Sequence, residues 1–270
     1  MIRLTGHEFV PEATFTCGQC FRWVREGEDY LGIAGEKVCR IRDGVLLCPE
    51  EDNAFWYHYL CLDMDYAPMK EELLRRDSRL APCLAYGTGL RILRQELWES
   101  IASFILSANN NIPRICKIID TLCRLYGKPL EYEGKQYFGF PEPKTLAMLE
   151  REDLAPLRAG YRDVYLLDAA KRMAEGKISV ESLNEMSTDK ARNALMQIKG
   201  VGRKVADCIL LFALGRYEVF PQDVWIKRIM REVYGVAEKE AAAFAAETYA
   251  GYGGFAQQYL FYYYRAHTGE

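Results

Sequence analysis

A lysine and an aspartate in the C-terminal half of the chain are spaced so that they could share one reaction. Lys204 lies in the first turn of one expected helix, and Asp223 opens the next helix after Pro221. A lysine amine, whose ordinary pKa is about 10.4, forms Schiff bases once it is neutral, and both burial and a helix N-terminus disfavour its charged form. Backbone N–H groups at a helix start would keep Asp223 ionised and oriented, and such a carboxylate can stabilise a cationic sugar.

A glycine-rich turn, Gly200-Val201-Gly202, comes shortly before this lysine and separates a helix that ends near Lys199 from one that begins at Arg203. Glycine lets a backbone approach a ligand closely. The second helix points its free N–H groups and positive dipole end across the turn, where a phosphate is the natural occupant. Val201 could anchor the turn to the body. The simpler interpretation is an ordinary interhelical turn, but the amphipathic helix before it and V-A-D-C-I after it favour contact with a DNA backbone.

Other side chains near the turn support this interpretation. Cys208 follows Lys204 by one helical turn, so both can line one pocket. Lys199 and Arg203 add positive charge beside the turn. Taken alone, Lys204 is equally well interpreted as a surface phosphate contact, and Asp223 as a plain N-cap. The order of hairpin, lysine and aspartate along the chain favours the interpretation in which they act together.

Composition limits the classes of protein that the chain could be. The 270 residues are 50% hydrophobic, with a formal net charge of -3 and a pI of about 5.8. This content supports a sizeable core, in one large domain or in two or three small ones. It argues against a broadly basic DNA-coating protein. No apolar run approaches the ~18 residues of a membrane span, so we expect no membrane association.

The nine cysteines are odd in number and scattered, which is typical of free thiols in a reducing cytoplasm. Cys17 and Cys20 form a C-x-x-C pair, but no second pair follows at zinc-ribbon spacing. No cluster of four cysteines follows the glycine-rich turn, which disfavours an iron–sulfur cluster. We therefore expect no metal site, and we interpret Cys17 and Cys20 as small buried strand residues.

The first part of the chain reads as a sheet. Alternating segments between residues 20 and 48 are separated by turns, among them Asp43-Gly44, a strong hairpin signal. The expected strands cover residues 20–24, 30–33, 38–41 and 45–48. This pattern predicts an antiparallel sheet of about four or five strands.

From Asn53 onward the period becomes helical, and 97–107 is apolar enough to be a buried helix. Further helices are expected over 113–126, 160–175, 181–184, 223–234, 239–250 and 253–266, with a loop or short hairpin over 127–141. The fold class is therefore α+β. We divide the chain into a sheet domain with flanking helices over 1–95 and an all-α body over 96–270, with the helix-hairpin-helix at about 187–215.

Five ordered segments resemble one family. L-M-Q-I-K-G-V-G-R-K-V-A-D-C-I-L-L-F-A-L, together with V-F-P-Q-D-V-W, resembles the helix-hairpin-helix/Gly-Pro-Asp superfamily of DNA glycosylases. C-G-Q-C-F-R-W, F-I-L-S-A-N-N-N-I-P-R-I, G-Y-R-D-V-Y and A-Q-Q-Y-L-F resemble segments of its 8-oxoguanine DNA glycosylases of the eukaryotic type. The resemblance covers nearly the whole chain. It implies a sheet domain like that of the TATA-box-binding protein, followed by an all-α glycosylase body.

The resemblance implies a role for each matching position. Lys204 would attack C1′ of the damaged nucleotide, and Asp223 would support cleavage of the glycosidic bond. Gly18 would offer its carbonyl to the N7–H that 8-oxoguanine has and guanine lacks, which is a sound discriminator because guanine N7 has no proton to donate. The base would have to leave the duplex before it is cut.

The rest of the lesion pocket is implied to come from the last helices. Cys208 and Phe261 would sandwich the flipped base, and Gln257 would meet its Watson–Crick edge. Two pocket positions depart from the family pattern, since Trp225 stands where eukaryotic members usually carry histidine and Phe212 replaces a more flexible residue. A tryptophan can still stack or donate through its ring N–H.

At the gap that the base leaves, the resemblance implies that Tyr161 wedges beside the vacated stack and that Asn109 fills the space. Arg114 and Arg162 would read the orphaned cytosine. Without the resemblance, Tyr161 is simply a staple at a helix start and Phe261 a core residue.

The resemblance as a whole implies a bifunctional 8-oxoguanine DNA glycosylase and abasic-site lyase of base-excision repair. It would act on 8-oxoguanine opposite cytosine in double-stranded DNA, through a Lys204 Schiff base and β-elimination, without a cofactor or a metal. The hairpin carbonyls near Val201 are compatible with a structural monovalent cation. We expect a monomer in the prokaryotic cytoplasm, associated with the nucleoid. The alternatives are a related glycosylase for an alkylated or another oxidised base, and a DNA-binding module that uses the hairpin alone.

Overall fold

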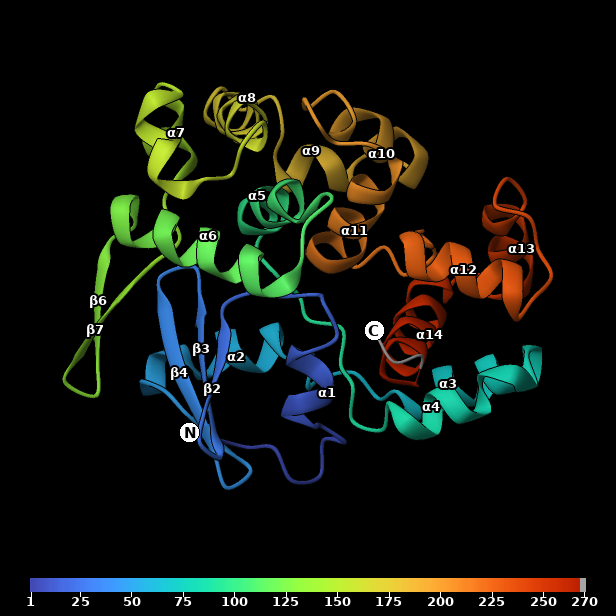
Figure 1. The fold of residues 1–270 in the computed structure, drawn as a ribbon. Coiled ribbons are helices and arrows are strands. Elements are labelled where there is room, and N and C mark those ends of the chain that lie inside the picture. The colour runs from blue at the N-terminus through green and yellow to red at the C-terminus, as the bar shows by residue number, and fades with distance from the viewer. Residues whose placement is uncertain (268–270) are drawn as a thin grey trace.

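The computed structural model describes residues 1–267, and it has the two parts that the sequence predicts, a sheet and a helical body (Figure 1). The sheet is antiparallel and five-stranded, in the order β1-β5-β4-β3-β2. Its strands are β1 (Ile2–Arg3), β2 (Trp23–Glu26), β3 (Asp29–Ala34), β4 (Lys37–Arg42) and β5 (Val45–Leu47). The predicted sheet of about four or five antiparallel strands is confirmed.

The predicted hairpin turn at Asp43-Gly44 is confirmed, but the first predicted strand begins later than expected. Asp43 and Gly44 form the turn between β4 and β5 with φ values of 50° and 71°, the paired positive φ of a tight hairpin. Cys17 and Cys20 are buried, as expected, but they lie in an irregular loop and not in a strand. β2 begins only at Trp23, after a loop in which the carbonyls of Thr16, Cys17 and Gln19 accept hydrogen bonds from side chains of other elements.

Short helices flank the sheet. α2 (Asn53–Tyr59) buries Trp56 and Tyr59 in a small core that also contains Ile41 and Leu46 of the sheet. The other helical segments of this part are α1 (Pro11–Phe15), η1 (Glu50–Asp52), α3 (Ala67–Arg76), η2 (Ser78–Leu80) and α4 (Ala81–Tyr86).

The helical body is built around α5 (Leu97–Ser107), which has the predicted bounds and is buried along nearly its whole length. It packs against α6, α8 and α11. The body comprises α6 (Ile112–Tyr126), α7 (Pro143–Ala147), η3 (Glu152–Leu157), α8 (Arg162–Ala174), α9 (Val180–Asn184), α10 (Thr188–Leu195), α11 (Arg203–Leu214), α12 (Val224–Glu232), α13 (Ala241–Thr248) and α14 (Gly253–His267).

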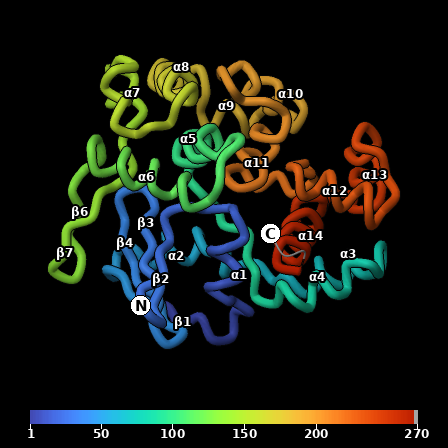
Figure 2. The backbone as a smooth tube through the Cα atoms, viewed as in Figure 1, coloured from blue at the N-terminus to red at the C-terminus, as the bar shows by residue number. Residues whose placement is uncertain are grey.

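The last helix returns to the first part of the chain. α14 packs against α4 as well as against α12, so the C-terminal helix lies beside a segment from the N-terminal part (Figure 2). The larger hydrophobic core accordingly contains Cys17 and Phe21 together with Phe255 and Leu260. The larger core is therefore shared by the two parts, while the sheet and α2 enclose a smaller core of their own.

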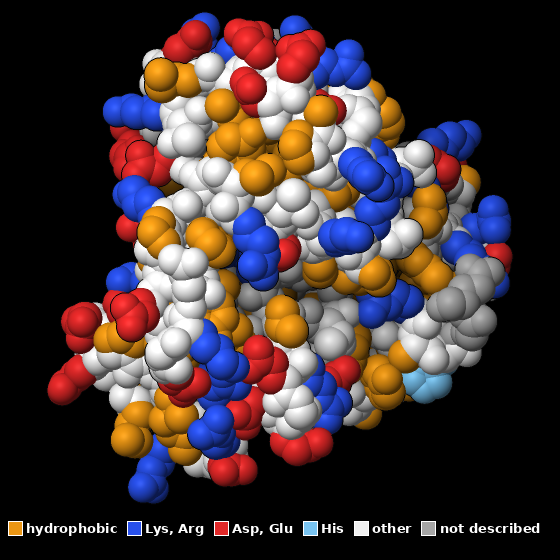
Figure 3. All heavy atoms as spheres, turned by 60° about the vertical axis from the view of Figure 1, so that its left-hand side comes forward, with side chains coloured by type: hydrophobic (Ala, Val, Ile, Leu, Met, Phe, Trp, Pro, Cys, Tyr) orange, Lys and Arg blue, Asp and Glu red, His pale blue; other side chains and the backbone are white. Residues whose placement is uncertain are grey.

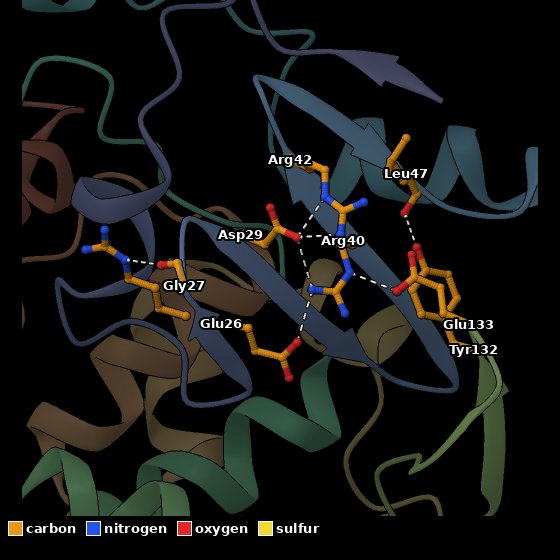
Figure 4. Close-up of polar contacts among 9 residues, drawn as sticks. Glu26, Gly27, Asp29, Arg40, Arg42, Leu47, Tyr132 and Glu133 are labelled. Atoms are coloured by element: carbon orange, nitrogen blue, oxygen red, sulfur yellow. Dashed lines mark hydrogen bonds and ion pairs between the residues drawn. The ribbon is translucent and has the colours of Figure 1, made fainter.

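A hairpin, β6 (Pro129–Tyr132) and β7 (Lys135–Phe138), reaches from the helical body back to the sheet. Its turn residue Glu133 accepts a hydrogen bond from Arg40 Nε at 2.9 Å (Figure 4). The Arg40 side chain is only 6% exposed, and it also pairs with Glu26 at 3.0 Å and Asp29 at 3.3 Å. One buried guanidinium thus joins three carboxylates from the two parts of the chain.

The helix before the glycine-rich turn ends earlier than predicted. α10 ends at Leu195 and not near Lys199, and residues 196–202 form an irregular connection. The reason is a change of hydrogen bonding, since the N–H groups of Ile198 and Val201 bond carbonyls three residues back, as in turns. Val201 is buried, as expected of the residue that anchors the turn.

Two residues of helix α8 contact this connection and hold it in place. The backbone N–H of Lys199 donates to the Asp168 carboxylate at 2.9 Å. Gly200 has a φ of 79°, and a Cβ atom at this position would lie 2.1 Å from Cδ2 of Tyr165. Only glycine therefore fits against the Tyr165 ring. Gly202, with nothing within 4 Å of such an atom, is not constrained by contact.

Replacing Arg40 with leucine should lower the free energy of unfolding by about 2 kcal/mol, because three carboxylates would lose their common cation. Urea denaturation at neutral pH measures this loss. Arg42→Leu is the matched control, since Arg42 also binds Asp29 but through a side chain that is 51% exposed. It should change stability far less. Equal losses in the two variants would contradict a special role for the buried guanidinium.

Gly200→Ala should destabilise the protein by about 2 kcal/mol, because alanine is strained at positive φ and its methyl group would collide with Tyr165. Gly202→Ala is the control in the same turn, where φ is -89° and the space is open, so it should be tolerated. Thermal unfolding of the two variants beside the wild type makes the comparison. A Gly200→Ala variant as stable as Gly202→Ala would show that the turn is not held against α8.

Candidate active site

Lys204 and Asp223 line one small cavity of about 40 Å³. Lys204 lies in the first turn of α11, where its Nζ is 5.7 Å from the centre of the Phe104 ring and its side chain hydrogen-bonds the Cys208 thiol. Asp223 is the N-cap of α12, and its carboxylate accepts a hydrogen bond from the Ile226 N–H at 2.8 Å. The predicted positions of the lysine in a first helical turn and of the aspartate at a helix start are confirmed.

Burial dominates the titration of two groups at this cavity. It raises the pKa of the Asp223 carboxyl above its ordinary value, although the Ile226 N–H, the charge of Lys204 and the Trp225 N–H all lower it. The N–H groups orient Asp223 as predicted, but burial outweighs the stabilisation that they give the ionised form. Burial likewise raises the pKa of the Cys208 thiol to about 11, against the nearby Lys204. Cys208 is therefore a neutral thiol at neutral pH and does not compete as a nucleophile.

The remaining wall of the cavity comes from opposite ends of the chain. It consists of the loop before β2, helix α14 and three further residues, namely Cys17, Gly18, Gln257, Gln258, Phe261, Phe104, Phe212 and Pro221. The structure thus brings Gly18, Gln257 and Phe261 to the same cavity as the lysine and aspartate. A cavity of this size has room for a few water molecules and not for a purine base.

Two polar groups at the cavity have no partner within residues 1–267. Gln257 is 6% exposed, and its Oε1 atom accepts no hydrogen bond there. The Gly18 carbonyl also accepts none, whereas the carbonyls of both its chain neighbours do. Buried polar groups are nearly always paired, so the open Gln257 amide oxygen indicates a ligand with a hydrogen-bond donor, and the open Gly18 carbonyl at the same cavity offers a second acceptor.

Gly18 is fitted to its place by contact as well as by conformation. Its φ is 79°, and a Cβ atom there would lie 3.4 Å from the Phe261 ring. The guanidinium of Arg265 lies 5.3 Å from the centre of that ring. A side chain at position 18 would therefore be strained and would press on the aromatic wall of the cavity.

Trp225, which is predicted for the lesion pocket, is not among the residues that line this cavity. The Trp225 ring lies instead 5.9 Å from the guanidinium of Arg228. Phe212 does line the cavity and stacks on Phe104, with ring centres 5.4 Å apart.

Four lining residues were not singled out from the sequence: Cys17, Phe104, Pro221 and Gln258. Phe104 reads as an ordinary core residue of an apolar helix. The other three stand next to or near residues of recognised segments, so adjacency to Gly18, Asp223 and Gln257 was the available signal.

The residues predicted for the gap beside the base are exposed. Tyr161 is 48% exposed, and Asn109 is exposed with a φ of 50°. The Tyr161 ring lies 5.6 Å from that of Tyr165, which packs under Gly200, so one ring links the predicted wedge to the hairpin. Arg114 is also exposed and lines an open groove of about 520 Å³.

Arg162 is placed differently from what its predicted role requires. It is only 4% exposed, and its guanidinium donates to the carbonyls of Ala108 at 2.9 Å, Asn109 at 2.8 Å and Ala159 at 3.0 Å. A buried guanidinium must find acceptors, and the carbonyls of the turn after α5, together with that of Ala159, supply them. In this state Arg162 fixes the segment that carries Asn109 and does not present its donors to a base.

An open groove of about 550 Å³ leads to the lysine. Lys204 lines it together with Arg203, Lys227 and Lys239, and these four basic side chains outnumber the acidic Asp207 and Glu238 of the same groove. On the face drawn in Figure 3, basic and acidic side chains are interspersed, with no broad basic field. Within residues 1–267, no group of three or more His, Cys, Asp or Glu side chains is placed to hold a metal ion, and no helix is long and apolar enough to span a membrane.

Comparison with known proteins agrees with this geometry. Residues 1–101 match the N-terminal domain of 8-oxoguanine DNA glycosylase, and residues 102–249 match the HhH-GPD superfamily of base excision DNA repair proteins. The N-glycosylase/DNA lyase OGG1 of Arabidopsis thaliana is 28% identical over 96% of this chain and 78% of its own.

Two solved structures are similar over almost their whole length. One is MBOgg1 in complex with a low-affinity DNA ligand, which is 41% identical over 97% of this chain and 94% of its own, with a TM-score of 0.92. The other is the 8-oxoguanine glycosylase/lyase of Clostridium acetobutylicum with double-stranded DNA that contains cytosine opposite 8-oxoguanine. It is 38% identical over 97% of this chain and 94% of its own, with a TM-score of 0.91. The chain therefore belongs to the 8-oxoguanine DNA glycosylase family of the HhH-GPD superfamily.

Proposed function

We propose that this protein is a bifunctional DNA glycosylase and abasic-site lyase that removes 8-oxoguanine paired with cytosine in duplex DNA. The observation that carries the proposal is the single cavity where Lys204, Asp223, the open Gly18 carbonyl and the unpartnered Gln257 Oε1 meet. The similar enzyme of Clostridium acetobutylicum, solved with DNA that contains 8-oxoguanine opposite cytosine, supports the choice of lesion and partner base.

The chemistry uses the amine and the carboxylate. The neutral Lys204 amine attacks C1′ of the damaged nucleotide, and the bond from C1′ to the base breaks with its electron pair leaving on the base. The Asp223 carboxylate stabilises the positive charge that develops on the sugar. The sugar opens to a Schiff base on Lys204, loses a proton from C2′, and expels the 3′ phosphate. The strand is cut by this β-elimination, and no step needs a cofactor.

Recognition of the lesion falls to the opposite wall of the cavity. The Gly18 carbonyl accepts the N7–H of 8-oxoguanine, and the Gln257 amide pairs with the Watson–Crick edge of the base. Cys208 and Phe261 cover its two faces. Since the cavity of about 40 Å³ is too small for a purine, the side chains must part on binding. Phe261, the partly exposed member of the wall, has room to move.

The exposed residues near the hairpin would hold the duplex open. Tyr161 wedges into the stack, Asn109 fills the gap, and Arg114 reads the orphaned cytosine. Arg162 contributes in this state by fixing the carbonyls of residues 108 and 109. The turn at Gly200-Val201-Gly202, with Lys199, binds a phosphate of the backbone. A monovalent cation held by backbone carbonyls of this turn would strengthen that contact.

We infer that the enzyme works as a monomer, because one chain supplies both reacting groups and the whole pocket wall. All nine cysteines are free thiols, which suits the reducing cytoplasm of a prokaryote, where the chromosome is the substrate.

Lys204→Gln should abolish covalent trapping by borohydride on an 8-oxoguanine·cytosine duplex and lower strand cleavage by at least about 1000-fold, because glutamine forms no Schiff base. Gel electrophoresis of the reduced protein–DNA adduct measures both. Lys144→Gln, at an exposed position of α7, is the matched control and should trap like the wild type.

A Lys204→Gln variant that still cross-links would remove the assignment of the nucleophile. The same assay, run opposite each of the four bases, tests the lesion pairing. Trapping should be most efficient opposite cytosine, and equal efficiency opposite all four would contradict the role of Arg114. Duplexes with alkylated bases, trapped better than 8-oxoguanine, would point to a related glycosylase instead.

Base release should fall as the pH is lowered, because Asp223 acts as a carboxylate and burial raises the pKa of that carboxyl. The loss should therefore begin at a higher pH than an ordinary aspartate would give. Asp223→Asn cannot ionise, so it should be slower by about 100-fold at neutral pH and should lose this acid limb. Single-turnover rates between about pH 4 and pH 8 measure both. An unchanged acid limb in the variant would assign the ionisation to another group.

A further inference from the structure

The loop before β2 is irregular and largely buried, and side chains from elsewhere hold three carbonyls in its first part. In the stretch 16–19, three carbonyls accept side-chain hydrogen bonds, from Arg265 at 2.7 Å (Thr16), from Gln258 at 2.8 Å (Cys17) and from Gln95 at 2.7 Å (Gln19). The carbonyl of Gly18 is the one in this stretch that accepts none within residues 1–267. The loop is thus fixed on both sides of a single open acceptor.

Two of the three donors belong to the helix that also forms the pocket. Gln258 and Arg265 lie on α14, as do Gln257 and Phe261, which line the cavity. Gln258 is 2% exposed, and its amide reaches the loop across the interior of the protein. One rigid helix therefore carries the residues that would face the base and the residues that fix the loop opposite them.

Glycine makes this fixation necessary. Gly18 has no side chain to pack, and glycine reaches many backbone conformations at little cost. Its carbonyl keeps one direction only if the peptide groups beside it are held. The Cys17 carbonyl belongs to the peptide that enters Gly18, so the bond from Gln258 fixes one of the two peptide planes that meet at the Gly18 Cα. The Gly18 carbonyl lies in the other plane, and the bond from Gln95 to the Gln19 carbonyl holds the chain just beyond it.

We propose that Gln258 is a positioning residue for lesion recognition, and that Arg265 assists it. By holding the carbonyls of Cys17 and Thr16, these side chains direct the Gly18 carbonyl into the cavity and set how well it meets an N7–H. This inference rests on the proposed function, because it concerns the choice between 8-oxoguanine and guanine. It assigns part of that choice to the hydrogen bond from Gln258 to the Cys17 carbonyl, which does not touch the base.

The test uses binding, in a Lys204→Gln background that cannot cut. The measured quantity is the ratio of the dissociation constants for duplexes that contain guanine and 8-oxoguanine opposite cytosine. Gln258→Met keeps the size of the side chain and removes the donor, so this ratio should fall about ten-fold, as expected when one discriminating hydrogen bond is lost. Tyr259→Phe is the matched control, because it removes a buried hydrogen bond from the same helix to the Leu90 carbonyl and leaves the bonds to the carbonyls of residues 16–19 in place. It should leave the ratio unchanged.

A second measurement separates positioning from general damage. With Lys204 restored, Gln258→Met should weaken excision of 8-oxoguanine at least about five-fold more than cutting of a preformed abasic site, which needs no base recognition. Arg265 is only partly buried, so we expect Arg265→Met to fold. This variant should lower the binding ratio by about two- to three-fold.

Three outcomes are distinct. A binding ratio in Gln258→Met equal to that in Tyr259→Phe would overturn the proposal, as would equal losses on 8-oxoguanine and abasic DNA. If the Lys204→Gln parent itself shows no preference for the 8-oxoguanine duplex, the proposed function fails before the role of Gln258 is in question.

Discussion

Burial of polar backbone in the loop from Thr16 to Gln19 is the constraint on which the rest of the site depends. A buried carbonyl without a partner costs about 1–3 kcal/mol, so this loop can exist only where donors from other elements reach it. The donors come from Gln95 and from α14, at the far end of the chain. The sheet domain and the last helix must therefore come together before the cavity exists, which is why the two parts share the larger core.

Local patterns predicted the fold well, and they failed where tertiary contacts decide. Alternation and the Asp43-Gly44 turn sufficed for the sheet, and the apolar run of α5 sufficed for its bounds. The same patterns misplaced the start of β2, because side chains far away in the sequence hold the loop before it in an irregular form. They also extended α10 too far, since nothing in the periodicity shows that Ile198 and Val201 bond as in turns.

Some residues of the site could be predicted from the local sequence, and others only from the family resemblance. Lys204 and Asp223 follow from local chemistry, because each stands at a helix start where its environment is set by neighbours in the sequence. Gly18, Gln257 and Phe261 came only from the resemblance, since no local pattern shows that the two ends of the chain meet. Resemblance does not fix the packing around each residue, and the burial of Arg162 and the contact of Trp225 with Arg228 are properties that a motif does not carry.

The separation of the amine from the carboxylate explains how both can stay reactive in one cavity. Within residues 1–267, Lys204 and Asp223 line the same space without forming an ion pair, whereas the structure pairs many exposed charges. A direct pair would engage the carboxylate with the amine and leave neither group open to a substrate. Asp223 is instead fixed by the Ile226 N–H, and Lys204 rests near Phe104 and Cys208.

The raised pKa of Asp223 is the thermodynamic consequence of that separation. Because burial lifts the folded-state pKa above that of the unfolded chain, ionisation of Asp223 at neutral pH opposes folding. The protein thus keeps a largely buried carboxylate without a direct ion pair where a cationic sugar would form, and it loses some stability in doing so. The electrostatic free energy of the ionised Asp223 is therefore lowest when positive charge develops on the reacting nucleotide.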